Sequence, residues 1–142
     1  MRNSIKNSEI YRIIDANLNR LKEGLRVCEE INRFVLSNRK LTAEFKKIRH
    51  EIDNISTSFF NRNKLLKYRN SLKDIGRDIP CPKEFKRKNF KDTFTANIQR
   101  VKESLRVLEE FSKIHDCRAA VRFKKLRYGI YELEKKAITY LS

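Results

Sequence analysis

Polar side chains recur at every third position in two stretches of this 142-residue sequence. The stretches read ANLNRLKEGLRVCEE at 16–30 and ANIQRVKESLRVLEE at 96–110. We call the shared polar set the ladder; its members are Asn17, Arg20, Glu23, Arg26 and Glu29 in the first copy, and Asn97, Arg100, Glu103, Arg106 and Glu109 in the second. Arginine forks bind phosphate oxygens, and carboxylates hold Mg²⁺. The ladder therefore suits phosphoryl transfer, in which catalysis is mostly positioning and neutralisation of charge.

A purely structural role is the competing interpretation of the ladder. Residues three apart on a helix are neighbours, and opposite charges there stabilise it by about 0.2–0.5 kcal/mol per pair. Such weak pairs are readily exchanged, yet every rung is identical in both copies, whereas apolar residues have changed, as from Leu21 to Val101. We therefore favour a functional interpretation, in which something covers the rungs that point outward. The rungs expected to be covered and paired outside their own helices are Arg20, Glu23, Arg100 and Glu103.

Hydrophobic residues spaced alternately by four and three positions mark the elements that must carry the ladder. Each of four such seams predicts an amphipathic helix in a bundle. The predicted helices span 9–36, 41–59, 92–114 and 117–140, with start signals at Ser8, Thr42, Asp92 and Asp116. FKKIRHEI at 45–52 echoes FKKLRYGI at 123–130, so the repeat is a helical hairpin present twice. We predict an all-α fold, a four-helix bundle built from two repeated hairpins (9–59 and 92–140) with pseudo-twofold symmetry.

A long irregular connector, about 61–89, separates the two halves. It contains both prolines and one of the three glycines, and it loses the helical periodicity after a short first piece. Connectors of this length are uncommon inside compact domains and are usually functional or disordered. We expect this one to be ordered over the bundle, because it carries apolar residues, namely Ile75, Ile79, Cys81 and Phe85.

Length and composition limit the class of protein. The chain is most simply one domain, 1–142, with 39% hydrophobic and 37% charged residues. A net charge of +16 indicates an anionic partner such as nucleic acid, acidic lipid or a phosphorylated metabolite, although the charge is spread from end to end. The three cysteines are far apart and predict reduced thiols of a cytoplasmic protein. No apolar run reaches membrane length, so no membrane partner is expected.

Five ordered segments between Tyr11 and Lys135 resemble the monofunctional hydroxymethylpyrimidine-phosphate kinase family of thiamine biosynthesis. The segments are DANLNRLKEGLRVCEEINRFV, FKKIRHEI, RNSLKDIG, TANIQRVKESLRVLEEF and FKKLRYGIYELEK. In that family the domain occurs alone or fused ahead of a thiamine-phosphate synthase barrel. The resemblance implies a helical kinase-like domain. The synthase reaction is expected of the fused relatives and not of these helical residues.

The implied reaction is an ATP-dependent phosphorylation of 4-amino-5-hydroxymethyl-2-methylpyrimidine phosphate to its diphosphate, with Mg²⁺ as cofactor. For this reaction the chemistry of the ladder predicts catalytic roles for Arg20, Glu23, Arg100 and Glu103. The residues predicted to bind substrate are Asn17, Arg26, Arg49, Arg69, Asn97, Arg106 and Arg127. The implied metal ligand is Asp74.

Two other functions stay open from the sequence. A basic helical nucleic-acid-binding module would gather its arginines on one open convex face, whereas the kinase would converge them on a cleft with carboxylates between them. A non-catalytic domain associated with thiamine-phosphate synthase is the second. Nucleic acid is the less expected partner, and a homodimer is a further expectation, since a second subunit could cover the ladder.

Overall fold

The computed structural model describes residues 2–82 and 86–141, with side chains from residue 7 onward. All regular secondary structure in these ranges is helical, which confirms the predicted all-α fold. The helices are α1 (Arg2–Glu30), extended by a π-helical turn η1 (Ile31–Val35), α2 (Arg39–Phe59), α3 (Arg62–Tyr68), the short 3₁₀ turn η2 (Ser71–Lys73), α4 (Phe90–His115) and α5 (Cys117–Ile138). None of the helices in the described ranges is long and apolar enough to cross a bilayer.

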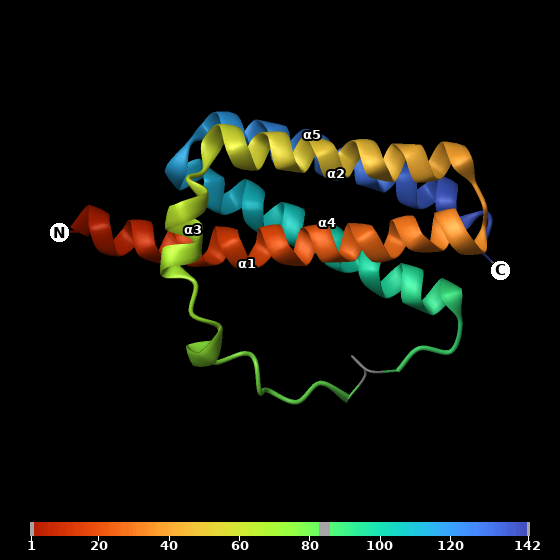
Figure 1. Ribbon diagram of the computed structural model, residues 1–142, viewed down its shortest axis with the longest axis horizontal. Helices are drawn as coiled ribbons and strands as arrows, with labels where there is room; N and C mark the ends of the chain where they lie inside the picture. The colour runs from red at the N-terminus through yellow and green to blue at the C-terminus, as the bar shows by residue number, and fades with distance from the viewer. Residues whose placement is uncertain (1, 83–85, 142) are drawn as a thin grey trace.

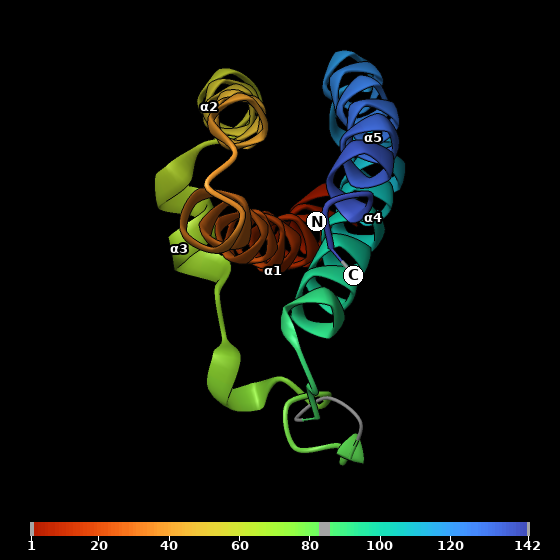
Figure 2. The ribbon, with the colours of Figure 1, turned by 90° about the vertical axis from the view of Figure 1, so that its right-hand side faces the viewer.

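The two halves of the repeat form two hairpins, α1 with α2 and α4 with α5. The long helices α1 and α4 run antiparallel and cross at the centre of the molecule (Figure 1), where they form the most extensive helix pair. In the end view, α2 lies over α1 and α5 over α4 (Figure 2). The seams of α1 and α4 meet in a fully buried core that includes Leu21, Leu25, Val101 and Leu105. The predicted bundle of two helical hairpins is therefore present.

Gly24 allows the close approach of α1 and α4. A Cβ atom at Gly24 would lie 2.9 Å from Val101 Cγ2 and 3.1 Å from the backbone oxygen of Asn97. Real Cβ atoms essentially never lie so close to another atom, so a larger residue would require Val101 or the backbone of α4 to shift. The equivalent position in α4 is another small buried residue, Ser104.

Asparagines begin two of the helices where the sequence suggested other residues. Asn38 Oδ1 accepts a hydrogen bond from Leu41 N at 3.0 Å, and Asn89 Oδ1 accepts one from Asp92 N at 2.8 Å. The start signals predicted at Thr42 and Asp92 are therefore wrong, because both residues lie within the first turn. Ser8 likewise lies inside α1. Asp116 does cap α5, as predicted, through a 2.9 Å hydrogen bond from Arg118 N to Asp116 Oδ1.

The connector packs on the bundle at its beginning. Helix α3 packs on α1 through the buried Leu65 and a stacked pair formed by Tyr68 and Tyr11, with ring centroids 6.0 Å apart. Beyond α3 the chain leaves the bundle (Figure 1). The expectation that apolar residues hold the connector over the bundle is wrong in the described part, because Ile75 is 92% and Ile79 67% exposed.

Cys81 and Phe85 are the other two apolar residues that were expected to hold the connector over the bundle. Cys81 is exposed as well. Phe85 lies outside the described residues. The segment 74–80 is rich in turns and presents no periodic apolar face, so it has no surface with which to pack.

Candidate functional site

The last rung of the ladder is buried in both repeats. Glu29 is 2% exposed and Glu109 4%. In the first hairpin, Arg49 of α2 donates from Nε to Glu29 Oε1 at 3.1 Å and from Nη2 to Glu29 Oε2 at 3.3 Å. In the second hairpin, Arg127 of α5 donates from Nε and Nη2 to Glu109 Oε1 at 3.1 and 3.0 Å. The same inter-helix ion pair therefore occurs at equivalent positions of both hairpins.

A second arginine, from the carboxylate's own helix, completes each arrangement. Arg26 Nη1 lies 3.4 Å from Glu29 Oε2, and Arg106 Nη1 lies 3.3 Å from Glu109 Oε2. We call these triads the clasps; the first is Arg26–Glu29–Arg49 and the second is Arg106–Glu109–Arg127. A buried carboxylate is costly unless it is paired and hydrogen-bonded, so each clasp must keep its arginines. The clasps give a structural reason why the ladder has the same arginine and glutamate at these positions of both repeats.

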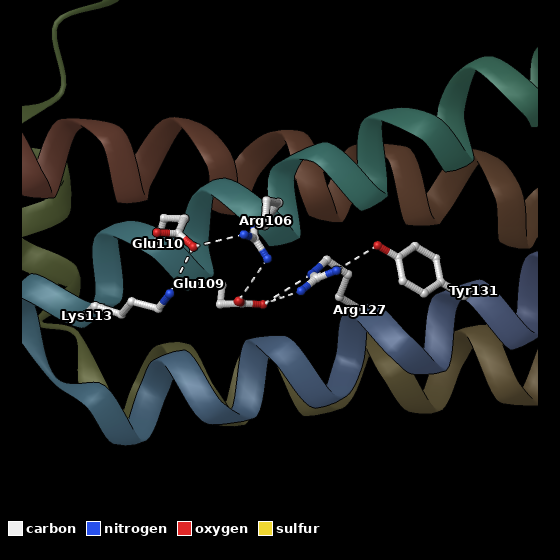
Figure 3. Close-up of polar contacts among 6 residues, drawn as sticks. All are labelled: Arg106, Glu109, Glu110, Lys113, Arg127 and Tyr131. Carbon is white, nitrogen blue, oxygen red and sulfur yellow. Dashed lines mark hydrogen bonds and ion pairs between the residues drawn. The ribbon is translucent and has the colours of Figure 1, made fainter.

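The second clasp continues into a polar network between α4 and α5. Figure 3 shows the Arg127 guanidinium between Glu109 and Tyr131, and Arg127 Nη1 donates to the Tyr131 hydroxyl at 2.7 Å. This hydrogen bond, together with the one to Glu109, raises the pKa of Arg127 above its ordinary value, so the side chain stays charged. On the other side, Glu110 accepts from Lys113 at 2.9 Å and pairs with Arg106 at 3.3 Å. The Lys113 hydrogen bond and the nearby positive charges lower the pKa of Glu110.

A cleft of about 360 Å³ lies beside the second clasp. Its lining residues are Gln99, Lys102, Glu103, Arg106, Arg127 and Tyr131. Lys102 Nζ donates to both oxygens of Glu134, at 2.9 and 3.2 Å. In the first hairpin the residue equivalent to Tyr131 is Asp53, which binds Lys22 Nζ at 3.1 Å. The two hairpins therefore share the clasp but differ in the groups beside it.

The outward rungs are not covered in the structure. Arg20, Glu23, Arg100 and Glu103 are all exposed, so the expectation of coverage is wrong for the four residues. The cleft contains one of the four, Glu103, and brings it near the predicted substrate-binding residues Arg106 and Arg127. The catalytic and substrate-binding assignments remain predictions.

The two ladder asparagines make local hydrogen bonds. Asn17 Nδ2 donates to the backbone oxygen of Ile13 at 2.9 Å, and Asn97 Nδ2 donates to that of Thr93 at 2.8 Å. Both bonds reach back four residues within the same helix. In both repeats the asparagine side chain therefore donates to the backbone of its own helix, and these two hydrogen bonds do not connect the two hairpins.

Arg69 anchors the connector to α1 through a buried carboxylate. Its Nε and Nη2 donate to Asp15 Oδ2 and Oδ1, both at 2.7 Å, and the hydrogen bonds raise the pKa of Arg69. Sequence reasoning missed Asp15, as it missed Tyr131 and the inter-helix role of the two buried glutamates. The only signal at Asp15 is an acidic residue directly after the seam residue Ile14, at the edge of the apolar face.

The donor groups expected for a metal do not form a cluster. Asp74, the predicted ligand, is exposed, and its Oδ1 accepts the Gly76 N–H at 2.9 Å. Within residues 2–82 and 86–141 no group of three or more His, Cys, Asp or Glu side chains is placed to hold a metal ion. Mg²⁺ as a cofactor stays a prediction from the sequence. The role of Asp74 stays a prediction, and no chemical step is derived through a metal.

One cysteine and one histidine, Cys28 and His115, are shielded from solvent or engaged by a neighbour. Burial raises the pKa of the Cys28 thiol, which therefore stays protonated at neutral pH. His115 Nε2 lies 2.8 Å from the backbone oxygen of Phe59, and its ring stacks on Phe60. His115 thus joins the ends of α4 and α2.

Comparison with known proteins places the chain in a family. A model described as the ThiD2 family matches residues 12–136. The chain belongs to the ThiD2 family. The match spans both hairpins and the connector of this ThiD2 chain, and so includes both clasps.

Curated relatives of this ThiD2 chain carry the name thiamine-phosphate synthase. The relative from Nostoc punctiforme is 42% identical over 125 residues, which are 88% of this chain and 34% of the relative. The Synechocystis relative is 40% identical over 88% of this chain, and the match covers 35% of that relative. The Rhodopirellula baltica relative is 35% identical over 89% of this chain, and the match covers 35% of that relative. The ThiD2 chain thus spans about a third of the length of these relatives. No solved structure matches it.

These findings support the thiamine-biosynthesis context of the resemblance and correct its activity. The relatives are named thiamine-phosphate synthase, which is a different activity from an ATP-dependent hydroxymethylpyrimidine-phosphate kinase. The expectation that this ThiD2 chain is such a kinase is therefore contradicted. ATP, the pyrimidine phosphate and a homodimer partner stay predictions from the sequence.

Proposed function

We propose that this chain is a non-catalytic helical domain of thiamine biosynthesis that works together with a thiamine-phosphate synthase. The observation that carries the proposal is the 42% identity over 125 residues to a third of the Nostoc punctiforme synthase. The family match over residues 12–136 includes the ladder and both clasps. A partner role explains why a segment of this kind is present in proteins named for a synthase reaction.

The geometry of the clasps favours a structural over a catalytic domain. A general base must be able to reach a substrate proton. Glu29 and Glu109 are instead buried and bound by two arginines each. The clasps hold the two helices of each hairpin together, which is a structural role for these buried carboxylates.

The nucleic-acid alternative has less support from the arrangement of charge. It predicted arginines gathered on one open face. Arg49 and Arg127 instead turn toward buried carboxylates, and the exposed Arg26 and Arg106 each contact a glutamate three residues along the helix. Ladder arginines therefore alternate with carboxylates instead of forming a continuous basic surface.

The test assays the Nostoc punctiforme synthase and this chain separately and as a mixture. Three samples are assayed for thiamine phosphate formation: this chain alone, the relative without its matching segment, and the two mixed. We expect no product from the chain alone. We also expect the mixture to exceed the truncated relative in rate or in melting temperature, because the chain supplies the missing domain.

Circular dichroism provides the control, since it shows that the isolated chain is helical under the assay conditions. Product formation by the chain alone would contradict a non-catalytic role. A truncated relative with the full rate and stability of the intact protein would show that the segment has no supporting role.

A further inference from the structure

Helix α5 exposes aromatic and aliphatic side chains on the side that points away from the core. Its buried residues, from Ala119 to Ala137, recur mostly at intervals of three and four along one side of the helix. The opposite side of such a helix is ordinarily polar. Here Val121 is 67% and Tyr128 56% exposed, and α5 lies at an outer edge of the molecule in the end view (Figure 2). We call this side the α5 outer face; its exposed residues are Val121, Lys124, Tyr128, Tyr131, Glu132 and Lys135.

The repeat supplies a reference for the α5 outer face, because α2 has an equivalent face in the other hairpin. Tyr128 of α5 corresponds to His50 of α2, which is exposed. Tyr131 corresponds to Asp53, which is exposed and pairs with Lys22. The α2 face is therefore polar at both positions, as is usual for a helix side in water. The aromatic surface belongs to one hairpin and is not required by the repeated fold.

The two tyrosines of the α5 outer face are held in a fixed arrangement. Their rings meet edge to face, with centroids 5.6 Å apart and an interplanar angle of 82°. The Arg127 guanidinium lies 5.2 Å from the centre of the Tyr128 ring, and it donates to the Tyr131 hydroxyl at 2.7 Å (Figure 3). Side chains ordered in advance lose less conformational freedom on binding, and tyrosine is enriched among the residues that dominate interfaces. The face therefore has the properties of a preorganised contact surface.

The charges on either side of Tyr128 indicate which partner fits this surface. Lys124 lies four residues before Tyr128 and Glu132 four residues after it, and both are exposed. Residues four apart form one ridge on the surface of a helix. When two such ridges pack antiparallel about a twofold axis at Tyr128, Lys124 of each copy lies beside Glu132 of the partner subunit. The ridge is thus complementary in charge to its own reversed copy. The equivalent ridge of α2 has Asn54 in place of the glutamate and is not.

We propose that the α5 outer face is the contact surface of a homodimer, in which two α5 helices pack antiparallel about a twofold axis. Tyr128 lies at the centre of the contact with Tyr131 beside it. Lys124 and Glu132 form two symmetric ion pairs, because a twofold contact uses the same patch on both subunits. The sequence predicted a homodimer that covers the ladder, whereas this contact lies on α5, which carries no rung. The dimer does not rest on the proposed function.

Sedimentation equilibrium of the full chain tests the dimer. The measurement covers chain concentrations of about 10 µM to 1 mM, because one helix pair is smaller than the standard interface of about 800 Å² per partner and should associate weakly. It is made in about 0.15 M NaCl, which screens the repulsion between two chains of net charge +16. We expect a reversible equilibrium between monomer and dimer in this range.

A tyrosine variant tests the centre of the contact. Tyr128→His gives α5 the residue that α2 has at the equivalent position, and it should raise the dissociation constant of the dimer by about tenfold or more. The matched control is His50→Ala, which changes an exposed residue of the equivalent α2 face and should leave the dissociation constant unchanged. Thermal melts check that both variants are folded.

Charge reversals separate the specific ion pairs from the effect of net charge. Lys124→Glu and Glu132→Lys each place like charges side by side, and each should weaken the dimer by about fivefold or more. Net charge alone would make the first variant associate more tightly and the second less tightly. The double variant restores opposite charges, so it should return to within about twofold of the parent. Lys46→Glu makes the same change of charge as Lys124→Glu on the α2 face and should not weaken the dimer.

Four results would overturn the proposal. The first is a monomer at every concentration up to 1 mM. The second is a dimer that Tyr128→His and His50→Ala weaken equally, since the contact would then lie elsewhere. The third is tighter or unchanged association of Lys124→Glu. The fourth is a double variant that is no stronger a dimer than the two single reversals.

Discussion

At the scale of single residues, the ladder divides into members with different environments. The glutamates at its end are buried in the clasps, whereas Arg20, Glu23, Arg100 and Glu103 are exposed. Spacing by three identifies residues that share a strip of their own helix. It does not say which part of that strip another helix covers, and for that reason the sequence could not separate the two groups.

The second clasp should contribute strongly to stability. Glu109→Gln removes the charge that two arginines face, and breaking a buried pair at one partner costs about 3–5 kcal/mol. We expect a loss in the free energy of unfolding near the lower end of this range, measured by urea denaturation. The matched control is Glu103→Gln, which removes the same charge from an exposed rung of α4 and should change stability by less than about 0.5 kcal/mol.

A double variant tests whether Glu109 acts through Arg127. Glu109→Leu with Arg127→Met replaces the pair by apolar groups and leaves no buried charge unpaired. The double variant should therefore cost less than the sum of the two single changes. Additive losses would mean that the two side chains stabilise the protein independently of each other.

Asp116 gives the stability a dependence on pH. Its hydrogen bonds from the Arg118 side chain and backbone N–H lower its pKa from 3.8 to about 2. A carboxyl with a lowered pKa in the folded state stabilises the fold fully above its unfolded pKa and loses this contribution as the pH falls. We expect the melting temperature to fall between pH 4 and pH 2 by less in Asp116→Asn than in the parent. Identical pH profiles would show that Asp116 has no part in this loss.

At the scale of elements, hydrophobic spacing was sufficient to predict the four long helices and their hairpins. The seams were reliable because a helix that buries one face repeats its apolar residues at intervals of three and four. The starts were less reliable, since Thr42 and Asp92 are plausible caps that lie just after the asparagines the chain uses. The connector was placed wrongly because isolated apolar residues such as Ile75 indicate burial only when they share a face.

Two glycines in helix interiors test the close crossing of α1 and α4. Gly24→Ala would place a methyl group 2.9 Å from Val101 Cγ2, and overpacking of this kind costs about 1–3 kcal/mol. Gly129→Ala makes the same chemical change where nothing lies within 4 Å, so only the higher helix propensity of alanine acts. We expect the first variant to lower the melting temperature and the second to raise it. The same sign of change in both would contradict a tight crossing at Gly24.

At the scale of the whole molecule, a bundle of two clasped hairpins matches about a third of each thiamine-phosphate synthase to which it is similar. Sequence resemblance placed the chain in the right biosynthetic context but assigned it a kinase activity that the relatives' names contradict. The sequence shows arginines and carboxylates, which are residue types that suit phosphoryl transfer. It does not show that some of these arginines pair with the carboxylates. In the fold, the buried carboxylates serve to join helices.

Replacement of the matching segment in the Nostoc punctiforme synthase tests the central claim most directly. The measurement compares thiamine phosphate formation and melting temperature in four proteins: the intact relative, the relative without the segment, and chimeras that carry this chain either unchanged or with Glu29→Gln and Glu109→Gln together. If the chain is a supporting domain held together by its clasps, the chimera with the unchanged chain should regain the activity and melting temperature that are lost on deletion. The chimera with Glu29→Gln and Glu109→Gln should not regain them. Full activity and stability in the deletion protein, or equal restoration by both chimeras, would contradict it.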